Sequence, residues 1–564
     1  NASRNLTTAE VLVIGSRFTL WVRNPKKGKS LSEINLYCYV RSCIQSNLCL
    51  ELHTKMLYLS QLMNNEKYIS DKQYWRDLAH AELEEALNVK KNENRAKNVI
   101  LFIGDGMGPN TITATRIYKG GEGYRMAFEE FPHVGLLKTY SANKMVPDSA
   151  STATAMFTGT KVNQRTIGVD ATVAADDCPK SLDPEAQLKS LAAVALEAGK
   201  SAGFVTTMRV THATPAPLYA HTCNRHWECE SVIPQESRAC KDIARQLVED
   251  WPGRDLHVIM GGGRQMLISN SSALEGDPIN LWGCYSTDGR DLIRDWKMDK
   301  EQRELKYSVV QNNSQLSGVN FDDTDYLMGI FANGHMAYEF ERNHGPEGMP
   351  SISEMVEAAI KVLRRNPNGY FLMVEGGNID MAHHRGRAKT AIDEAAAMED
   401  AVRIAASMTD EADTLLVVTA DHTHTLSING YPLRGSNIFG HSEVSPYDHK
   451  LYTTLSYGTG GPGALHYQVE DQHVVRKEPG NSDDFMYEQI AGIILDENSH
   501  GGGDTTIYAR GPKSHLFHTV HEQHYVFHAL CRAAQIGDHA TDAAANAALA
   551  LSVLLVAGVV HLIC

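Results

Sequence analysis

Five short apolar segments constrain the fold of this chain more than any other feature. They are Asn98–Gly104, Ser201–Thr207, Asp255–Gly261, Gly369–Val374 and Thr414–Thr419. Segments with helical spacing, such as Glu185–Ala198, lie between them. Continuous apolar strands that alternate with helices indicate a parallel sheet whose two faces are both covered. The sequence therefore predicts an α/β fold with a large, mostly parallel central sheet and helices on both faces.

The composition narrows the class of protein. The chain has 564 residues, a formal net charge of −15 and no long basic run, which argues against a nucleic-acid-binding surface. Its 25 histidines cluster in the second half, which favours metal binding. Ten cysteines without a CxxC pair, together with sequons at Asn1, Asn5, Asn270 and Asn312, favour a secreted or surface glycoprotein with disulfide bonds.

The N-terminal part of the chain differs in style from the rest. We interpret residues 1–64 as an atypical leader that is not part of the fold. Glu66–Lys90 has helical spacing and many charges, which predicts a surface helix that could also pack on a partner. We expect one folded domain over residues 65–540, with an insertion in the polar, Gly- and Pro-rich stretch from about Ser427 to His500.

The C-terminal segment predicts attachment to a membrane. Ala547–Cys564 is almost wholly apolar and follows a run of small residues, which is the pattern of a GPI-anchor signal. Asp542 is the first candidate for the attachment residue and Asn546 the second. A tail-anchored transmembrane helix is the competing interpretation. We expect residues 541–564 to be removed and the protein to lie on the extracellular face of the cell membrane.

Candidate metal ligands are densest in the run Val374–His384, which contains Glu375, Asp380, His383 and His384. Asp380 and His384 are four residues apart, so a helix would place both on one face. A carboxylate and an imidazole that face one point suit zinc. Glu375 would lie at the C-terminal end of a strand, where open α/β sheets carry their chemistry. An exposed Asp–His pair on a helix would leave the same pattern.

Two further segments add an acid and a nucleophile. Asp105 follows a predicted strand in the run Gly104–Gly108, whose glycine spacing does not match a dinucleotide-binding loop and suits a metal bridge better. Ser149 follows Asp148 near a predicted helix N-terminus, where the helix dipole stabilises a serine alkoxide and a bound phosphate. A simple N-cap would have the same residues.

Three more segments carry polar groups of the same kind. Thr214 precedes Arg225, which could clamp phosphate oxygens in a bidentate manner, although an isolated arginine is more often a surface charge. Asp421 and His422 follow the predicted strand Thr414–Thr419 and could chelate one ion. His500 stands in a glycine-rich setting that leaves its ring accessible.

These segments, in this order, make the chain similar to metazoan alkaline phosphatases of the GPI-anchored kind, from about Glu66 to about Cys531. The resemblance implies a phosphate monoester hydrolase with an alkaline optimum and a broad substrate range. It implies two zinc ions and one magnesium ion per subunit. The implied ligands are Asp380, His384 and His500 for the first zinc, Asp421, His422 and Asp105 for the second, and Asp105, Thr214 and Glu375 for magnesium.

The resemblance also implies a mechanism. Ser149 would attack phosphorus and form a phosphoserine, Arg225 would clamp the phosphate, and a zinc-bound hydroxide would complete hydrolysis. His212 and His424 match positions that orient ligands or water. His383 is a neighbour of a ligand and is not expected to bind metal.

The chain departs from vertebrate members of the family at two places. Met381 stands where they have a histidine that helps to hold water and phosphate, so the rate or the pH optimum is expected to differ. The pair Phe331–Ala332 lacks the carboxylate of their calcium site, with Glu347 as one further candidate ligand. We expect calcium to be weakly bound or absent.

Other implications of the resemblance concern assembly. Cys178 and Cys240 match a disulfide of the family, whereas the partners of Cys229, Cys284 and Cys531 stay open. The insertion at about residues 430–497 matches the family's crown at the dimer interface, and Tyr431 matches a residue that reaches into the partner's site. A homodimer is therefore expected. A surface receptor without turnover, or a related phosphodiesterase or sulfatase, is the rival interpretation.

Overall fold

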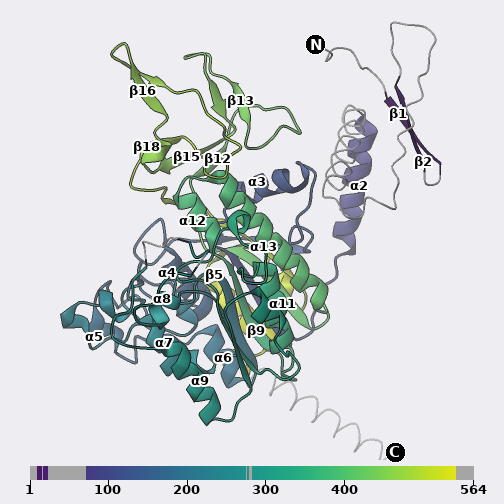
Figure 1. Cartoon of the computed structure of the whole chain (residues 1–564). Coiled ribbons are helices and arrows are strands. Elements are labelled where there is room, and N and C mark those ends of the chain that lie inside the picture. The colour runs from purple at the N-terminus through teal and green to yellow at the C-terminus, as the bar shows by residue number, and fades with distance from the viewer. Residues whose placement is uncertain (1–8, 15–16, 23–70, 275, 279–282, 541–564) are drawn as a thin grey trace, which may run out of the picture. The chain divides into compact units, whose positions relative to one another are not determined.

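The computed structural model describes residues 9–14, 17–22, 71–274, 276–278 and 283–540, in two compact units, Asn1–Asn88 and Val89–Cys564 (Figure 1). The first unit contains the hairpin β1 (Ala9–Ile14) and β2 (Arg17–Val22) and the helix α2 (Lys72–Asn88), which corresponds to the predicted surface helix. Most of the predicted leader and the candidate anchor residues Asp542 and Asn546 lie outside the described residues. Within the described part of the chain, no helix has the length and apolar character to cross a membrane.

The second unit is built on a ten-stranded sheet in the order β21-β4-β20-β10-β3-β9-β5-β6-β8-β7. Only β20 runs against the other strands of this sheet, so it is mostly parallel as predicted. The strands are β3 (Asn98–Gly104), β4 (His133–Lys138), β5 (Ser201–Arg209), β6 (Val258–Gly262), β7 (Tyr307–Val310), β8 (Tyr326–Ile330), β9 (Tyr370–Gly376), β10 (Thr414–Ala420), β20 (Thr505–Arg510) and β21 (Thr519–Glu522).

Side chains alternate between two separate cores, one on each face of the sheet. On β3, Leu101 and Ile103 pack in one core, whereas Ile100 and Phe102 pack in the other. Because both faces are apolar, the strand reads as an uninterrupted apolar run in the sequence. Each fully buried Leu, Ile or Phe side chain stabilises the fold by roughly 1.5–3 kcal/mol.

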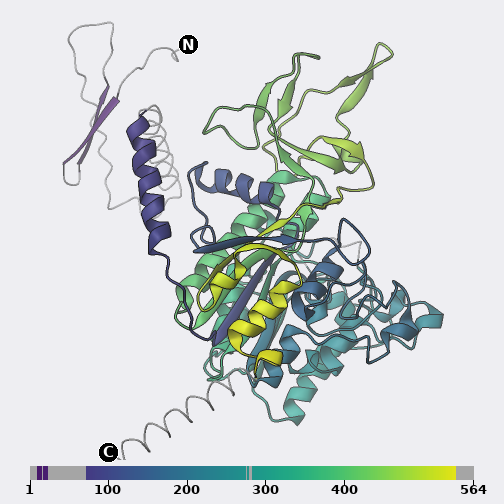
Figure 2. The ribbon, with the colours of Figure 1, turned by 180° about the vertical axis from the view of Figure 1, so that it is seen from behind.

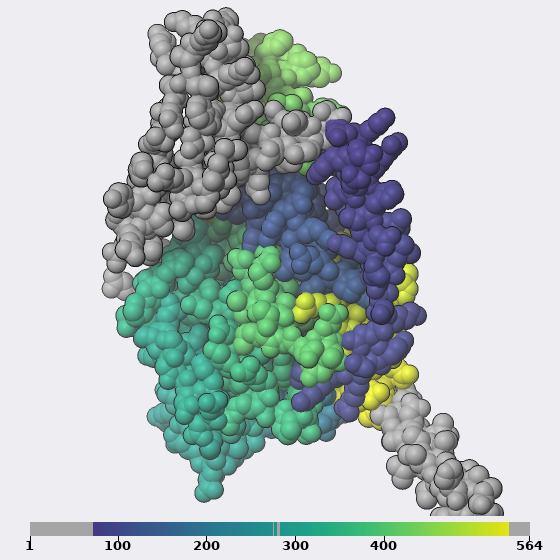
Figure 3. Space-filling view, turned by 90° about the vertical axis from the view of Figure 1, so that its right-hand side faces the viewer, coloured from purple at the N-terminus to yellow at the C-terminus, as the bar shows by residue number. Residues whose placement is uncertain are grey.

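Helices cover both faces of the sheet (Figures 1 and 2). One core contains residues of α11 (Ile352–Leu363) and α13 (Ala388–Met408), whose side of the molecule is seen in teal and green in Figure 3. The other core contains residues of α4 (Ser149–Thr158), α6 (Leu191–Glu197) and α14 (Tyr525–Ala534). The remaining α-helices of this unit are α3 (Pro109–Gly120), α5 (Cys178–Ser181), α7 (Ile243–Glu249), α8 (Arg264–Leu267), α9 (Leu292–Gln302), α10 (Asn313–Ser317) and α12 (Asn378–His384).

One helix is shorter than the sequence predicts. The expected helix Glu185–Ala198 begins only at Leu191, because the Ser190 side chain caps it by accepting a hydrogen bond from the Ala193 N–H at 3.1 Å. Gln187 lies before this cap and forms a β-bridge with Val169 instead.

Two disulfides link neighbouring segments: Cys178–Cys240, as expected, and Cys229–Cys284, which the sequence left open.

Small sheets follow β10 and are drawn in light green at the top of Figure 1. They are β12 (Leu426–Ile428), β15 (Leu455–Gly460) and β18 (Ala491–Ile494) in one sheet, and the pairs β13 (His441–Val444) with β14 (Leu451–Thr453) and β16 (Tyr467–Glu470) with β17 (His473–Arg476). The chain returns through β19 (His500–Gly501), which pairs with β11 (Thr423–His424) so that His424 lies opposite His500. This return brings a distant segment back to the C-terminal end of β10.

Candidate metal centre

The polar groups of the centre gather where four neighbouring strands end. In the sheet order β10-β3-β9-β5, Ala420 pairs with Gly104, and Gly104 pairs with Gly376. Asp105 follows β3 directly and its N–H donates to the Gly376 carbonyl at 3.2 Å. Because β3 lies between β10 and β9, Asp105 is flanked by the groups that follow both strands. This position explains how one carboxylate can serve two neighbouring cation sites.

Asp380, His384 and His500 form the first group of candidate ligands. Asp380 Oδ2 lies 3.3 Å from His384 Nε2, the Nε2 atoms of His384 and His500 are 3.1 Å apart, and His500 Nε2 lies 3.5 Å from Asp380 Oδ1. A tetrahedral zinc ion with bonds of about 2.0–2.1 Å separates its ligand atoms by about 3.3 Å. The three side chains therefore already have the spacing that one zinc ion requires.

His424 lies beside this group but has a different geometry. Its Nε2 is 2.5 Å from Asp380 Oδ1, which is a hydrogen-bond distance and is too short for two ligands of one tetrahedral ion. The ring therefore contacts the Asp380 carboxylate through a hydrogen bond. Burial opposes a charge on His384, but the adjacent Asp380 carboxylate outweighs it and raises the pKa of His384 to about 9.

Asp421, His422 and Asp105 form the second group. His422 Nε2 is 3.2 Å from Asp105 Oδ1 and 3.3 Å from Asp421 Oδ2, again the spacing of ligands around one zinc ion. Ser149 Oγ lies 3.3 Å from the same His422 Nε2, and Ser149 is 1% exposed. The serine hydroxyl thus lies directly beside this group of candidate ligands.

Asp148 and Ser149 form the start of α4. Asp148 is the N-cap of α4, because its carboxylate accepts a hydrogen bond from the Ser151 N–H at 3.2 Å. Ser149 is the first helical residue, and its side chain turns toward His422. The helix α4 therefore presents the hydroxyl at its N-terminal end, where the helix dipole favours negative charge.

Asp105, Thr214 and Glu375 form a group of oxygen atoms on the other side of β3. Thr214 Oγ1 donates to Asp105 Oδ2 at 3.4 Å, and Thr206 Oγ1 donates to Glu375 Oε2 at 2.5 Å. The buried oxygen Glu375 Oε1 has no hydrogen-bond partner. Unpaired buried carboxylate oxygens are costly, and a cation would satisfy them. Hard oxygen ligands of this kind suit magnesium.

The pKa values of the buried carboxylates also favour bound cations. Burial, together with the charges of Asp380 and Glu375, raises the pKa of Asp105 well above its usual value. Burial also raises the pKa of Glu375 to about 7 and that of Asp421 to about 7. Buried carboxylates that are packed together resist ionisation, and bound cations would remove this penalty. The residues present therefore fit a centre of several cations.

Arg225 is anchored at the edge of the centre. Its Nη1 donates to Asp148 Oδ2 at 3.1 Å, and its Nη2 lies 3.4 Å from His212 Nε2. The guanidinium is therefore held next to the residue that precedes Ser149. His212 itself is buried and its Nδ1 has no hydrogen-bond partner.

Three other residues singled out in the sequence lie apart from the ligand groups. His383 is buried and contacts Thr111 Oγ1 at 3.0 Å and the Tyr457 hydroxyl at 2.7 Å. Tyr431 is 87% exposed in the insertion. Glu347 accepts a hydrogen bond from the Asn312 amide at 2.8 Å.

Sequence reasoning missed several polar residues that support the centre. Thr152 Oγ1 donates to Asp421 Oδ2 at 3.2 Å, and Asn498 contacts both His384 and His424. Glu497 Oε1 is 3.5 Å from His384 Nδ1. No sequence signal distinguishes these Thr, Asn and Glu residues from ordinary polar residues of helices and loops.

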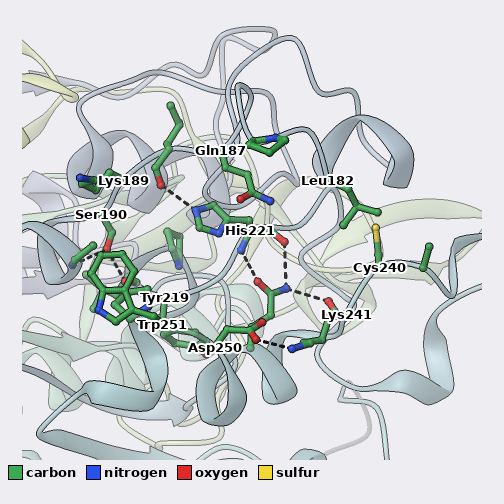
Figure 4. A pocket seen from close by; sticks show the side chains of 18 residues that line it. Leu182, Gln187, Lys189, Ser190, Tyr219, His221, Cys240, Lys241, Asp250 and Trp251 are labelled. Carbon is green, nitrogen blue, oxygen red and sulfur yellow. Dashed lines mark hydrogen bonds and ion pairs between the residues drawn. The ribbon is translucent and has the colours of Figure 1, made fainter.

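A cavity of ≈ 610 Å³ lies elsewhere in this unit (Figure 4). Several of its polar side chains are paired with one another or with the main chain: His221 Nε2 contacts the Leu188 carbonyl at 3.0 Å, and Lys241 Nζ donates to Asp250 Oδ1 at 2.5 Å. None of the ligand groups described above lines it. We therefore assign this cavity no part in the chemistry of the centre.

A buried serine held against sites for several cations is typical of a metal-dependent hydrolase. Comparison with known proteins identifies the family: residues 96–536 match the model of the alkaline phosphatase family, and the chain belongs to that family. It is 43% identical over 502 residues to the tissue-nonspecific alkaline phosphatase of Gallus gallus, covering 86% of this chain and 94% of the relative. It is 38% identical over 508 residues to the membrane-bound alkaline phosphatase of Bombyx mori, covering 86% and 90%.

Solved structures agree with the fold. The alkaline phosphatase of Thermus thermophilus has a TM-score of 0.55 at 22% identity, covering 80% of this chain and 93% of that one. The predicted α/β fold, the family and the enzyme class are thus confirmed. The protein is a metal-binding phosphate monoester hydrolase.

Proposed function

We propose that this enzyme hydrolyses phosphate monoesters through a phosphoserine on Ser149, with two zinc ions and one magnesium ion bound per subunit. The observation that carries the proposal is the position of Ser149 Oγ, 3.3 Å from His422 Nε2 within a group spaced for zinc. The zinc ligands would be Asp380, His384 and His500 at the first site, and Asp421, His422 and Asp105 at the second. Asp105, Thr214 and Glu375 would hold magnesium.

When bound, the zinc ions supply Lewis-acid chemistry: they lower the pKa of the serine hydroxyl and of water and stabilise charge on the attacking and leaving oxygens. The residues of the chain position the nucleophile and the phosphate of the substrate. The helix α4 directs Ser149 Oγ at the phosphorus of the substrate, and Arg225 binds two phosphate oxygens while Asp148 holds its guanidinium in place.

The reaction then has two balanced steps. Ser149 loses its hydroxyl proton, and its Oγ forms a bond to phosphorus as the ester P–O bond breaks; the leaving oxygen takes up a proton and departs as the alcohol. Water next loses a proton and attacks phosphorus as the Oγ–P bond breaks; inorganic phosphate leaves, and Ser149 Oγ regains a proton. Such displacements depend on positioning and charge stabilisation, which this buried cluster of fixed polar groups favours. His212 and His424 orient Arg225 and Asp380.

The alkaline optimum and the broad substrate range belong to the same proposal. The groups described in the centre bind phosphate and metal, and none of them is assigned to the alcohol part of the substrate. Met381 directly follows the proposed ligand Asp380 in α12, and it is half-buried. Because its thioether cannot donate a hydrogen bond to water or phosphate, we expect the rate or the pH optimum to differ from those of vertebrate relatives.

Assembly and location are further parts of the proposal. Tyr431, Leu433 and Tyr447 of the insertion are 87%, 83% and 96% exposed, which supports burial of this crown, at about residues 430–497, in a homodimer. The membrane-bound Bombyx mori relative supports membrane association, which we propose occurs through a GPI anchor on the extracellular face. Residues 65–540 form the catalytic domain in this proposal. A monomeric mass in light scattering would contradict the dimer.

Hydrolysis of p-nitrophenyl phosphate at high pH, before and after EDTA, tests the activity. We expect activity that EDTA abolishes and that zinc with magnesium restores. Ser149→Ala is the matched variant, and full activity in this variant would overturn the mechanism. A protein that binds metals and phosphate but shows no turnover would instead support the rival role of a surface receptor.

A further inference from the structure

Asn498 is not a candidate ligand, yet it contacts His384 of the first zinc group and His424 beside that group. It is completely buried between β18 and β19. Its main-chain N–H donates to the His384 carbonyl at 2.8 Å, and its own carbonyl lies 2.7 Å from His384 Nδ1. A carbonyl can only accept, so His384 carries its proton on Nδ1. In the neutral ring the lone pair is therefore on Nε2, which faces Asp380 and His500.

The side chain of Asn498 has an equally defined orientation. Its Nδ2 donates to the Thr459 carbonyl and, at 2.7 Å, to Thr425 Oγ1. Because the Thr459 carbonyl cannot donate, the amide cannot be reversed, and Oδ1 faces His424 Nδ1 at 2.6 Å. His424 is thereby held with its Nε2 against Asp380 Oδ1.

We propose that Asn498 is a positioning residue of the first zinc site, and this inference rests on the proposed zinc site of Asp380, His384 and His500. Its main chain fixes the tautomer and the ring plane of His384. Its side chain fixes His424, which in turn fixes the Asp380 carboxylate. The residue thus contacts one of the three ligands directly and a second through His424, while Thr425 and Thr459 hold its side chain in place.

The experiment measures zinc retention in the complete protein. Wild type, Asn498→Ala and Asn498→Asp are dialysed against graded chelator concentrations, and bound zinc is counted by mass spectrometry. We expect Asn498→Ala to release one of its two zinc ions about 10- to 100-fold more easily, since loss of such supporting contacts weakens metal binding by this factor. Asn498→Asp keeps an oxygen for His424 and should fall between wild type and Asn498→Ala.

Asn429→Ala is the matched control. The Asn429 amide also ties strands of the insertion together, through the Thr454 carbonyl at 3.1 Å and Ser456 Oγ at 2.8 Å, but it touches no ligand. Its zinc release should match wild type. Equal zinc release by wild type and Asn498→Ala would overturn the inference, as would loss of both zinc ions in proportion to a lower Tm of the metal-free protein. A wild-type protein that binds no zinc at Asp380 would overturn the proposed site itself.

Discussion

Replacement of Glu375 by glutamine should change stability in opposite directions in the metal-free and metal-loaded protein. Glu375 is fully buried, and burial raises its pKa from 4.5 to about 7. The folded metal-free state therefore holds its proton where the unfolded state has lost it, so stability decreases as the pH rises from about 4.5 to about 7. A shift of about 2.5 units at about 1.36 kcal/mol per unit corresponds to about 3 kcal/mol above pH 7.

Glu375→Gln removes this titration and keeps the shape of the side chain. At pH 8 the metal-free variant should be more stable than metal-free wild type by about 3 kcal/mol, and at pH 5 the gain should fall below about 1 kcal/mol. With magnesium and zinc present the order should reverse, because the variant has lost a charged ligand. Urea denaturation of EDTA-treated and metal-loaded proteins at both pH values measures this. A metal-free variant that gains nothing at pH 8, or gains equally at pH 5, would refute the electrostatic account of the centre.

Three other predictions follow from the same geometry. Ser149→Ala should lower kcat for p-nitrophenyl phosphate by at least about a thousandfold while bound zinc stays near the wild-type level; loss of zinc in parallel would mean that the serine is only structural. Arg225→Ala should weaken inhibition by inorganic phosphate by roughly 10- to 100-fold, since each hydrogen bond to a charged group contributes about 1.5–3 kcal/mol; an unchanged inhibition constant would place the phosphate elsewhere. The double substitution Cys178→Ser and Cys240→Ser should lower the free energy of unfolding by about 2–4 kcal/mol, and an unchanged urea midpoint would show that the disulfide does not restrain the fold.

The sequence predicted the centre of the sheet better than its edges. Strands β3, β9 and β10 are buried on both faces, so each appears as an uninterrupted apolar run. Strand β4 near the edge of the sheet has exposed Val134 and Leu136 on one face and was not foreseen, because its pattern resembles that of a loop. The start of α6 depended on the Ser190 cap, which periodicity alone does not reveal.

The candidate site was predictable where ligands follow strands. Asp105, Glu375 and Asp421 could be found because acids at strand ends interrupt apolar runs, and parallel strands bring such ends together. Which histidine contacts which carboxylate could not be deduced, since His424 and His500 are brought together only by the return of the chain through β19. Asn498 escaped notice because a single asparagine in a loop has many ordinary roles.

The central claim is that Ser149 carries the phosphoryl group during turnover. Acid quenching of the enzyme during hydrolysis of a phosphate monoester, followed by proteolysis and mass spectrometry, detects this intermediate directly. We predict a phosphorylated peptide whose modified residue is Ser149, absent from the Ser149→Ala protein. Rapid turnover with no phosphorylated peptide, or with the phosphate on another residue, would contradict the account.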